Sequence, residues 1–107
     1  RSEVVTRLHR HYRHSSKTQR HHGQPVILSV AKGYDDRLER PDSGFYLSSD
    51  NNRLYHTMWL NALAFQPDIV LITSWNEWHE GTEIEPSREE GEMWLTLTRL
   101  YTTMEPH

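Results

Sequence analysis

The chain has 107 residues, contains no cysteine and carries a formal net charge of −3. These totals exclude a disulfide framework and a thiolate metal site, and they do not point to a nucleic-acid binder. No apolar run approaches the ~20 residues that a membrane-spanning helix needs. The length fits one small domain over residues 1–107, although 35% hydrophobic residues is little for a stable core in so short a chain. Because the chain begins with Arg1 and shows no signal peptide, we expect a processed product or a fragment.

A basic helix is predicted over residues 3–18, where Val4, Leu8 and Tyr12 recur at helical spacing. Six of the 12 Lys and Arg residues fall within residues 1–22, against one of the 15 acidic residues. Four cations share one face of this helix: Arg7, Arg10, Arg13 and Lys17. Such a face is typical of a solvated helix surface. The alternative function that it offers is a non-enzymatic basic module that binds anions.

The same segment is rich in histidine, which raises the question of a metal site. The histidines are His9, His11, His14, His21 and His22. His11 and His14 have the i, i+3 spacing of two ligands on one helix face, but no further ligand follows at a useful spacing. The sequence therefore predicts no metal site.

Two short apolar runs predict β-strands at residues 25–31 (PVILSVA) and 68–74 (DIVLITS). Continuous apolar runs rich in β-branched residues are typical of strands that are buried on both faces. A long polar loop is predicted over residues 32–50, because Gly, Pro, Asp and Ser are frequent there.

A second helix is predicted over residues 51–65, between the two strands. Ser49 or Asp50 is expected to cap its start, and Pro67 ends it. Its apolar stripe consists of Leu54, Met58, Ala62 and Phe65.

The last helix is predicted from about Ser87 to Thr103. Ser87 and Glu90 fit a capping box at its start, and Gly91 makes a later start equally compatible with the sequence. Its apolar stripe consists of Met93, Leu97 and Leu100.

The order of elements is therefore helix, strand, helix, strand, helix. Buried strands that alternate with helices favour a parallel sheet with right-handed crossovers. Two strands alone cannot form such a sheet with both faces covered. The α/β pattern therefore predicts that the chain is part of a larger α/β fold.

The stretch SWNEWHEGTEIE, residues 74–85, is both acidic and aromatic and directly follows the second strand. In α/β barrels the active site lies at this end of the strands. Glu77 and Glu80 are three residues apart, so the two carboxyl groups can face one cavity. Carboxyl groups roughly 5–5.5 Å apart suit retaining glycoside hydrolysis, and unequal burial separates their pKa values. The alternative is that this acidic loop merely favours a helix N-terminus.

Other residue types near this pair suit sugar binding. Trp75 and Trp78 offer flat apolar faces for sugar C–H groups, or they pack in a core. Asn76 and His79 offer neutral hydrogen bonds to hydroxyl groups. The first strand is followed by Tyr34, Asp35 and Asp36, which are expected at the same edge or in a simple turn. Glu83 and Glu85 are expected to be solvated or structural.

The stretch ITSWNEWHEGTEIEPS, residues 72–87, resembles the signature of glycoside hydrolase family 99, the endo-α-mannosidases and their bacterial relatives. SVAKGYDD, residues 29–36, resembles the Gly-Tyr-Asp loop of that family. The resemblance implies an α/β fold that is the C-terminal fragment of a (β/α)₈ TIM barrel, about two βα units plus a preceding helix. Residues 25–31 would then be the seventh strand and residues 68–74 the eighth.

The resemblance also implies an activity, which is hydrolysis of an internal α-mannosidic bond with retention of configuration. By motif position, Glu77 is the base that activates the 2-hydroxyl group of the substrate, and Glu80 is the acid and then the base. The implied partner is a mannose-containing glycan or polysaccharide, and no metal or other cofactor is needed. The resemblance is compatible with a secreted, periplasmic or Golgi-lumen location and does not select among them. The isolated fragment is expected to be inactive.

Two details leave room for other interpretations. Related barrel domains in polysaccharide-synthesis proteins carry a similar motif, so the alternative is a domain that binds glycan without cleaving it. Relatives usually have Gly-Pro or Met-Pro before the Gly-Tyr pair, whereas this chain has Ala31-Lys32. Lys32 is therefore either a substrate contact or a sign of lost function.

Overall fold

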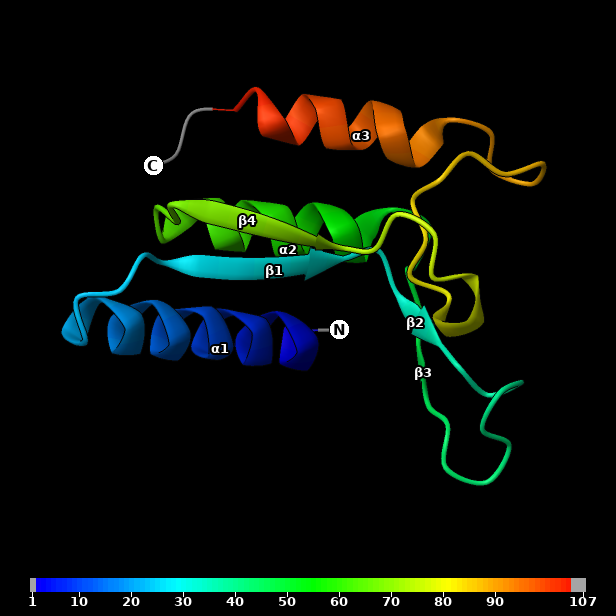
Figure 1. Ribbon diagram of the computed structural model, residues 1–107, viewed down its shortest axis with the longest axis horizontal. Helices are drawn as coiled ribbons and strands as arrows, with labels where there is room; N and C mark the ends of the chain where they lie inside the picture. The colour runs from blue at the N-terminus through cyan, green and yellow to red at the C-terminus, as the bar shows by residue number, and fades with distance from the viewer. Residues whose placement is uncertain (1, 105–107) are drawn as a thin grey trace.

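The computed structural model describes residues 2–104, except for the side chains of Ser2 and Val4. Its elements follow one another as helix, strand, hairpin, helix, strand and helix (Figure 1). They are α1 (Ser2–His21), β1 (Ile27–Ala31), β2 (Tyr34–Asp35), β3 (Tyr46–Leu47), α2 (Arg53–Ala64), β4 (Ile69–Thr73), the 3₁₀ turn η1 (Trp78–Glu80) and α3 (Met93–Thr102).

β1 and β4 lie side by side and run parallel, as predicted from the two apolar runs. Their register pairs Ile27 with Ile69 and Ala31 with Thr73. Both strands therefore end at the same edge, where the chain enters the loops that begin at residues 32 and 74 (Figure 1). This arrangement brings two segments of the expected site together.

The two strands have one covered and one open face, because α2 lies behind them and contacts β1 (Figure 1). Leu28 and Val30 point into the core, whereas Ile69 and Leu71 are 46% and 51% exposed. The apolar runs are typical of strands buried on both faces, and the open face agrees with the expectation that two strands alone cannot cover both. Among residues 2–104, no element covers the open face, although its apolar side chains suit a buried one.

The core is built mainly from aromatic side chains of α2 and α3. Tyr55 lies edge-on to Trp94 and to Tyr101, with ring centroids 5.6 Å apart in both pairs, and Trp59 stacks on Tyr101 at 5.5 Å. Edge-to-face pairs add stability beyond the area that they bury. Tyr12 of α1 closes the core from the side, and its hydroxyl group donates a 2.7 Å hydrogen bond to the Ser29 carbonyl.

The buried faces of α2 and α3 differ from the predicted stripes. Leu54 and Ala62 are buried as expected, but Met58 and Phe65 are only partly buried while Tyr55, Trp59 and Leu63 fill the core. In α3, Trp94 and Tyr101 are buried and Leu100 is 54% exposed. Aromatic side chains occupy these core positions because each of them buries more surface than an aliphatic side chain does.

The ends of the helices also differ from prediction. α1 continues to His21 and stops at Gly23, whose φ of +66° places it in the left-handed region. At the start of α2, the backbone carbonyls of Ser49 and Asp50 accept hydrogen bonds from Leu54 and Arg53 N–H, and the side chain of Asn52, the residue before the helix, makes no capping hydrogen bond.

α3 begins only at Met93, so the later of the two predicted starts is confirmed. Ser87 Oγ accepts a hydrogen bond from Glu90 N–H at 2.9 Å, but this contact belongs to a tight turn closed between Ser87 and Gly91. The predicted capping box is therefore half formed and lies before the helix.

The predicted polar loop contains a short hairpin that the sequence did not reveal. β2 and β3 pair antiparallel, with Tyr34 opposite Leu47 and Asp35 opposite Tyr46. The hairpin projects away from the strands at the edge where they end (Figure 1).

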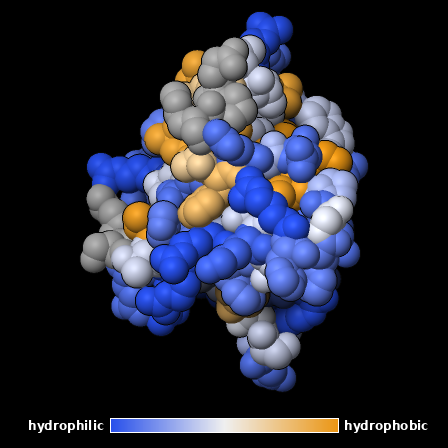
Figure 2. Space-filling view, turned by 90° about the vertical axis from the view of Figure 1, so that its left-hand side faces the viewer, coloured by the Kyte–Doolittle hydropathy of each residue, from blue (hydrophilic) through white to orange (hydrophobic). Residues whose placement is uncertain are grey.

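The surface is largely hydrophilic at the level of α1, whereas apolar patches appear higher on the same face (Figure 2). The predicted cationic side chains of α1 are all exposed: Arg7, Arg10, Arg13 and Lys17. Within residues 2–104, no helix combines the length and apolar character needed to cross a lipid bilayer.

Candidate active site

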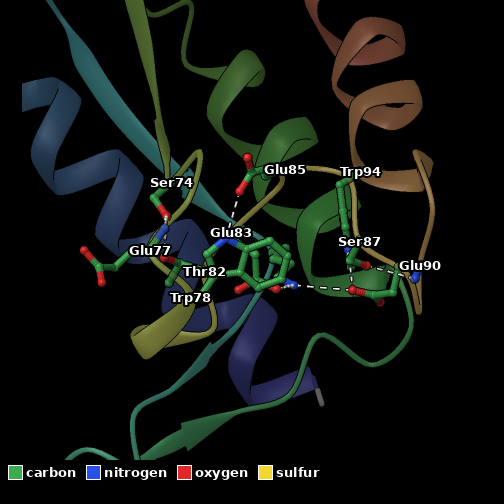
Figure 3. Close-up of polar contacts among 10 residues, drawn as sticks. Ser74, Glu77, Trp78, Thr82, Glu83, Glu85, Ser87, Glu90 and Trp94 are labelled. Atoms are coloured by element: carbon green, nitrogen blue, oxygen red, sulfur yellow. Dashed lines mark hydrogen bonds and ion pairs between the residues drawn. The ribbon is translucent and has the colours of Figure 1, made fainter.

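The segment after β4 folds back on itself around Ser74. Ser74 N–H donates to the Thr82 carbonyl at 2.9 Å, and the Ser74 carbonyl accepts from Ile84 N–H at 3.0 Å. The Ser74 hydroxyl group lies 2.8 Å from Thr82 Oγ1 and accepts a 3.0 Å hydrogen bond from Glu77 N–H (Figure 3). These contacts fix residues 74–85, which we call the glutamate loop, to the end of β4.

Glu77 and Glu80 stand at the two ends of the η1 turn. Glu77 is the residue before the turn, its backbone carbonyl accepts from Glu80 N–H at 3.2 Å, and its side chain is exposed. Its carboxylate points away from Glu83 and Glu90 (Figure 3). Glu80 is half-buried and lies close enough to Tyr34 to act on it electrostatically. That both carboxylates face one cavity stays a prediction.

The expected sugar-binding side chains surround this turn. Trp75 and Trp78 are 51% and 46% exposed, so neither is a core residue in this chain. Trp78 Nε1–H donates a 2.8 Å hydrogen bond to Glu85 Oε1, which fixes the indole plane (Figure 3). Asn76 is exposed, and His79 Nδ1 lies 2.8 Å from Glu39 Oε1 in the hairpin loop.

The glutamate loop packs closely on β2 through Gly81. A Cβ atom at Gly81 would lie 3.1 Å from Asp35 N, and φ there is +65°. Only glycine meets both conditions without strain. The Gly-Tyr-Asp segment after β1 is thus held against the residues that follow Glu80, as the parallel pairing of β1 and β4 predicts.

Asp36 organises the hairpin loop, although the sequence offered it only as a turn residue or a site residue. It is 3% exposed and accepts hydrogen bonds from Tyr34 OH at 3.0 Å, Arg40 Nη1 at 2.6 Å and Phe45 N–H at 2.9 Å. Three donors satisfy a buried carboxylate. Asp36 therefore has a structural role here, and it positions Tyr34 near Glu80.

Hydrogen bonds and burial together shift the pKa values of three side chains in this loop. Hydrogen bonds from Arg37 lower the pKa of Asp35 to about 2. Burial acts to raise the pKa of Asp36, but the hydrogen bonds from Arg40, Phe45 and Tyr34 outweigh it and hold that pKa below its usual value. Burial, followed by the hydrogen bond to Asp36, raises the pKa of Tyr34.

These lowered pKa values predict a loss of stability in acid. A carboxyl group with a folded pKa below its unfolded value stabilises the fold above the unfolded pKa, and this contribution disappears as pH falls through the folded pKa. For Asp35 the window runs from 3.8 down to about 2. We expect the free energy of unfolding to fall more steeply over this window in the parent protein than in an Asp35→Asn/Asp36→Asn variant. Urea unfolding at several pH values measures it, and a constant difference between the two proteins would contradict the assignment.

Lys32 is buried and is not placed to contact a substrate. Its Nζ lies 2.8 Å from Glu83 Oε2 and 3.5 Å from Glu90 Oε1. Glu90 Oε1 also accepts a 2.8 Å hydrogen bond from Trp94 Nε1–H (Figure 3). Glu83 is therefore structural, as expected. The pairing of Glu83 with Lys32 was not predicted, although Lys32 follows the strand that pairs with the one before Glu83.

A cavity in the described part of the chain lies away from the glutamate loop. It has a volume of about 490 Å³ and is found where α1, β3 and the start of α2 meet. It is lined by Val5, Leu47, Ser48, Asp50, Asn52, Arg53, Leu54, His56 and Thr57. We assign the candidate site to the glutamate loop rather than to this cavity. The loop offers carboxylates that can transfer protons and exposed indoles that can contact a sugar, whereas the volume of a cavity alone supplies no reactive group. Among residues 2–104, no three His, Asp or Glu side chains gather as metal ligands would.

Comparison with known proteins agrees with the sequence motif. A family model described as Glycosyl hydrolase family 99 matches residues 4–93. The chain is 40% identical over 82 residues to a glycoprotein endo-alpha-1,2-mannosidase-like protein of Danio rerio, covering 76% of this chain and 18% of that one. It is 43% identical over 82 residues to the protein of the same description in Homo sapiens, covering 76% and 17%.

Solved structures give the same picture. The GH99 endo-alpha-mannosidase from Bacteroides thetaiotaomicron superposes with a TM-score of 0.77 at 27% identity, covering 88% of this chain and 32% of that one. The chain thus spans less than a fifth of the curated relatives and about a third of this structure.

Proposed function

The chain belongs to glycosyl hydrolase family 99, and on that basis we propose that it carries the catalytic loop of an enzyme that cleaves α-mannosidic bonds with retention of configuration. The substrate is a mannose-containing glycan or polysaccharide. Glu77 and Glu80 are the catalytic residues. The substrate-binding residues are Trp75, Asn76, Trp78, His79, Tyr34 and Asp35.

The observation that carries this proposal is the place of Glu77 and Glu80. They bracket one short turn at the edge where two parallel strands end, beside two half-exposed indoles. Catalytic residues of α/β barrels come from this end of the strands. Exposed aromatic faces next to a carboxylate pair suit a sugar ring, which has apolar C–H faces and polar hydroxyl groups.

The chemistry assigns one proton transfer to each carboxyl group. Glu77 takes the proton of the 2-hydroxyl group, and O2 attacks C1 while the C1–O bond to the leaving group breaks. Glu80 gives its proton to the departing oxygen, so the products are a 1,2-anhydro sugar and a free alcohol. Glu80 then takes a proton from water, which opens the ring at C1, and protonated Glu77 returns its proton to O2. Two inversions at C1 give net retention.

In the complete enzyme, β1 and β4 are the seventh and eighth strands of a (β/α)₈ barrel. The open apolar face of the two strands supports this assignment, because Ile69 and Leu71 would face the barrel interior, which side chains fill. Six further βα units would supply the rest of the substrate cleft. Residues 1–107 alone are therefore inactive.

The product of the reaction tests this function. The longest polypeptide in which the segment occurs is incubated with a mannose oligosaccharide containing internal α-linkages, and NMR identifies the anomer released first. We expect the α-anomer. Release of the β-anomer would refute retention, and glycan binding without release would favour a domain that binds polysaccharide but does not cleave it.

A further inference from the structure

Four side chains form a polar cluster next to the glutamate loop, in which Lys32, Glu83 and Trp94 are buried and Glu90 is exposed. Lys32 comes from the end of β1, Glu83 from the glutamate loop, and Glu90 and Trp94 from the turn before α3 and from α3 itself. Lys32 is 7% and Glu83 8% exposed. Lys32 Nζ also lies 5.1 Å from the centre of the Trp94 ring. We call these four residues the Lys32 cluster.

The cluster depends on the single positive charge of Lys32. A buried charge is tolerated when it is paired and hydrogen-bonded. Glu83 Oε2 receives the 2.8 Å hydrogen bond from Lys32 Nζ, whereas Glu83 Oε1 is buried and has no hydrogen-bond partner among residues 2–104. Loss of the ammonium group would therefore leave a buried carboxylate without compensation, and the loop that carries it would have to move toward water.

The position of Glu83 in the chain connects this cluster to the proposed catalytic residues. Its two neighbours, Thr82 and Ile84, both hydrogen-bond to the backbone of Ser74. Ser74 Oγ in turn accepts from Glu77 N–H at 3.0 Å. A displacement of Glu83 would thus be transmitted through Ser74 to Glu77 within one closed loop.

We propose that Lys32 is a positioning residue for the proposed hydrolysis, which acts through Glu83 to hold the glutamate loop in its reactive geometry. This inference rests on the proposed function. The contacts that carry it are all internal to the chain, so they do not depend on what covers the open face of the strands. A misplacement of reacting groups by about 1 Å costs on the order of 10²-fold in rate.

The test uses Lys32→Met in the longest polypeptide that contains the segment, because Met keeps the apolar stem and removes the charge. Hydrogen exchange should become about tenfold faster or more for the amides of residues 74–85 while those of α1 stay unchanged. With a mannoside substrate, kcat should fall by about 10²-fold while KM stays within about twofold. Arg7→Met is the matched control, since Arg7 forms an exposed ion pair with Glu3 on α1, and it should change neither readout.

Unchanged exchange of the loop amides, or an unchanged kcat, would overturn the proposal, and so would a rise in KM alone. Should Lys32→Met fail to fold, Glu83→Gln decides the matter. It keeps the shape and an oxygen acceptor for Lys32, and it should give a smaller change in the same direction, so no change would again overturn the proposal. Absence of hydrolysis by the parent protein would refute the proposed function separately, and loop exchange would then decide whether Lys32 positions the loop.

Discussion

Glu80→Gln is expected to lower kcat on a mannoside with a poor leaving group by about 10²–10⁴-fold, the usual contribution of general acid–base catalysis. Gln keeps the shape of the side chain but cannot transfer a proton. A substrate with a good leaving group should recover part of the first step, because its departure needs less acid assistance. Steady-state kinetics on the two substrates measures the difference.

Glu77→Gln provides the contrast that assigns the roles. Its kcat should fall by a similar factor, about 10²–10⁴-fold, and a good leaving group should rescue little, since the 2-hydroxyl group remains unactivated. Glu89→Gln, at an exposed position outside the glutamate loop, is the matched control. Full activity in both variants would place the catalytic acids elsewhere. Equal loss in both, with no difference in rescue by the good leaving group, would refute the assignment of Glu77 as base and Glu80 as acid.

Trp94→Ala should cost about 3–5 kcal/mol in the free energy of unfolding, the usual range for removing a large buried aromatic side chain. Trp94 is 2% exposed, meets Tyr55 edge-on and donates from Nε1 to Glu90. Urea unfolding with a constant m-value measures the loss. Trp75→Ala is the matched control because that indole is 51% exposed, and its effect should stay within about 0.5 kcal/mol. Equal losses in the two variants would contradict the core described above.

The order of elements and the parallel strand pair could be predicted because they depend on patterns within short segments. The runs ILSVA and IVLIT are short, apolar and β-branched, and a helical pattern separates them. The parallel pairing places the ends of both strands together. It could therefore be predicted that the Gly-Tyr-Asp segment and the glutamate loop lie close to each other. Family membership followed from the same loop and is confirmed.

The packing of the helices could not be predicted in the same way, because α2 carries two apolar stripes that overlap. Its residues Met58 and Trp59 are neighbours in sequence, and helical periodicity supports either as a core position. The contacts with α3 decide in favour of the aromatic stripe, since Tyr55 meets Trp94 edge-on and Trp59 stacks on Tyr101. Burial of the strand faces also depends on what lies around them, which a local pattern does not contain.

In the candidate site, the local composition predicted which carboxylates and indoles take part. It could not predict contacts between residues that are far apart in the sequence. Lys32 and Glu83 are 51 residues apart, and no local pattern links them. The hydrogen-bond partners of Asp36 and Glu85 escaped prediction for a similar reason, since the bonds that these carboxylates accept from Phe45 N–H and Trp78 Nε1–H depend on the path of the loop.

The contacts between the glutamate loop and the segment after β1 define what can be exchanged between relatives. Lys32 binds Glu83, His79 meets Glu39, and Gly81 leaves room for the backbone of Asp35. Transplanting either segment alone into another member would separate all three pairs. Residues 32–39 and 74–85 therefore form one packed unit, and a chimera is expected to keep this geometry only when both pieces come from the same parent.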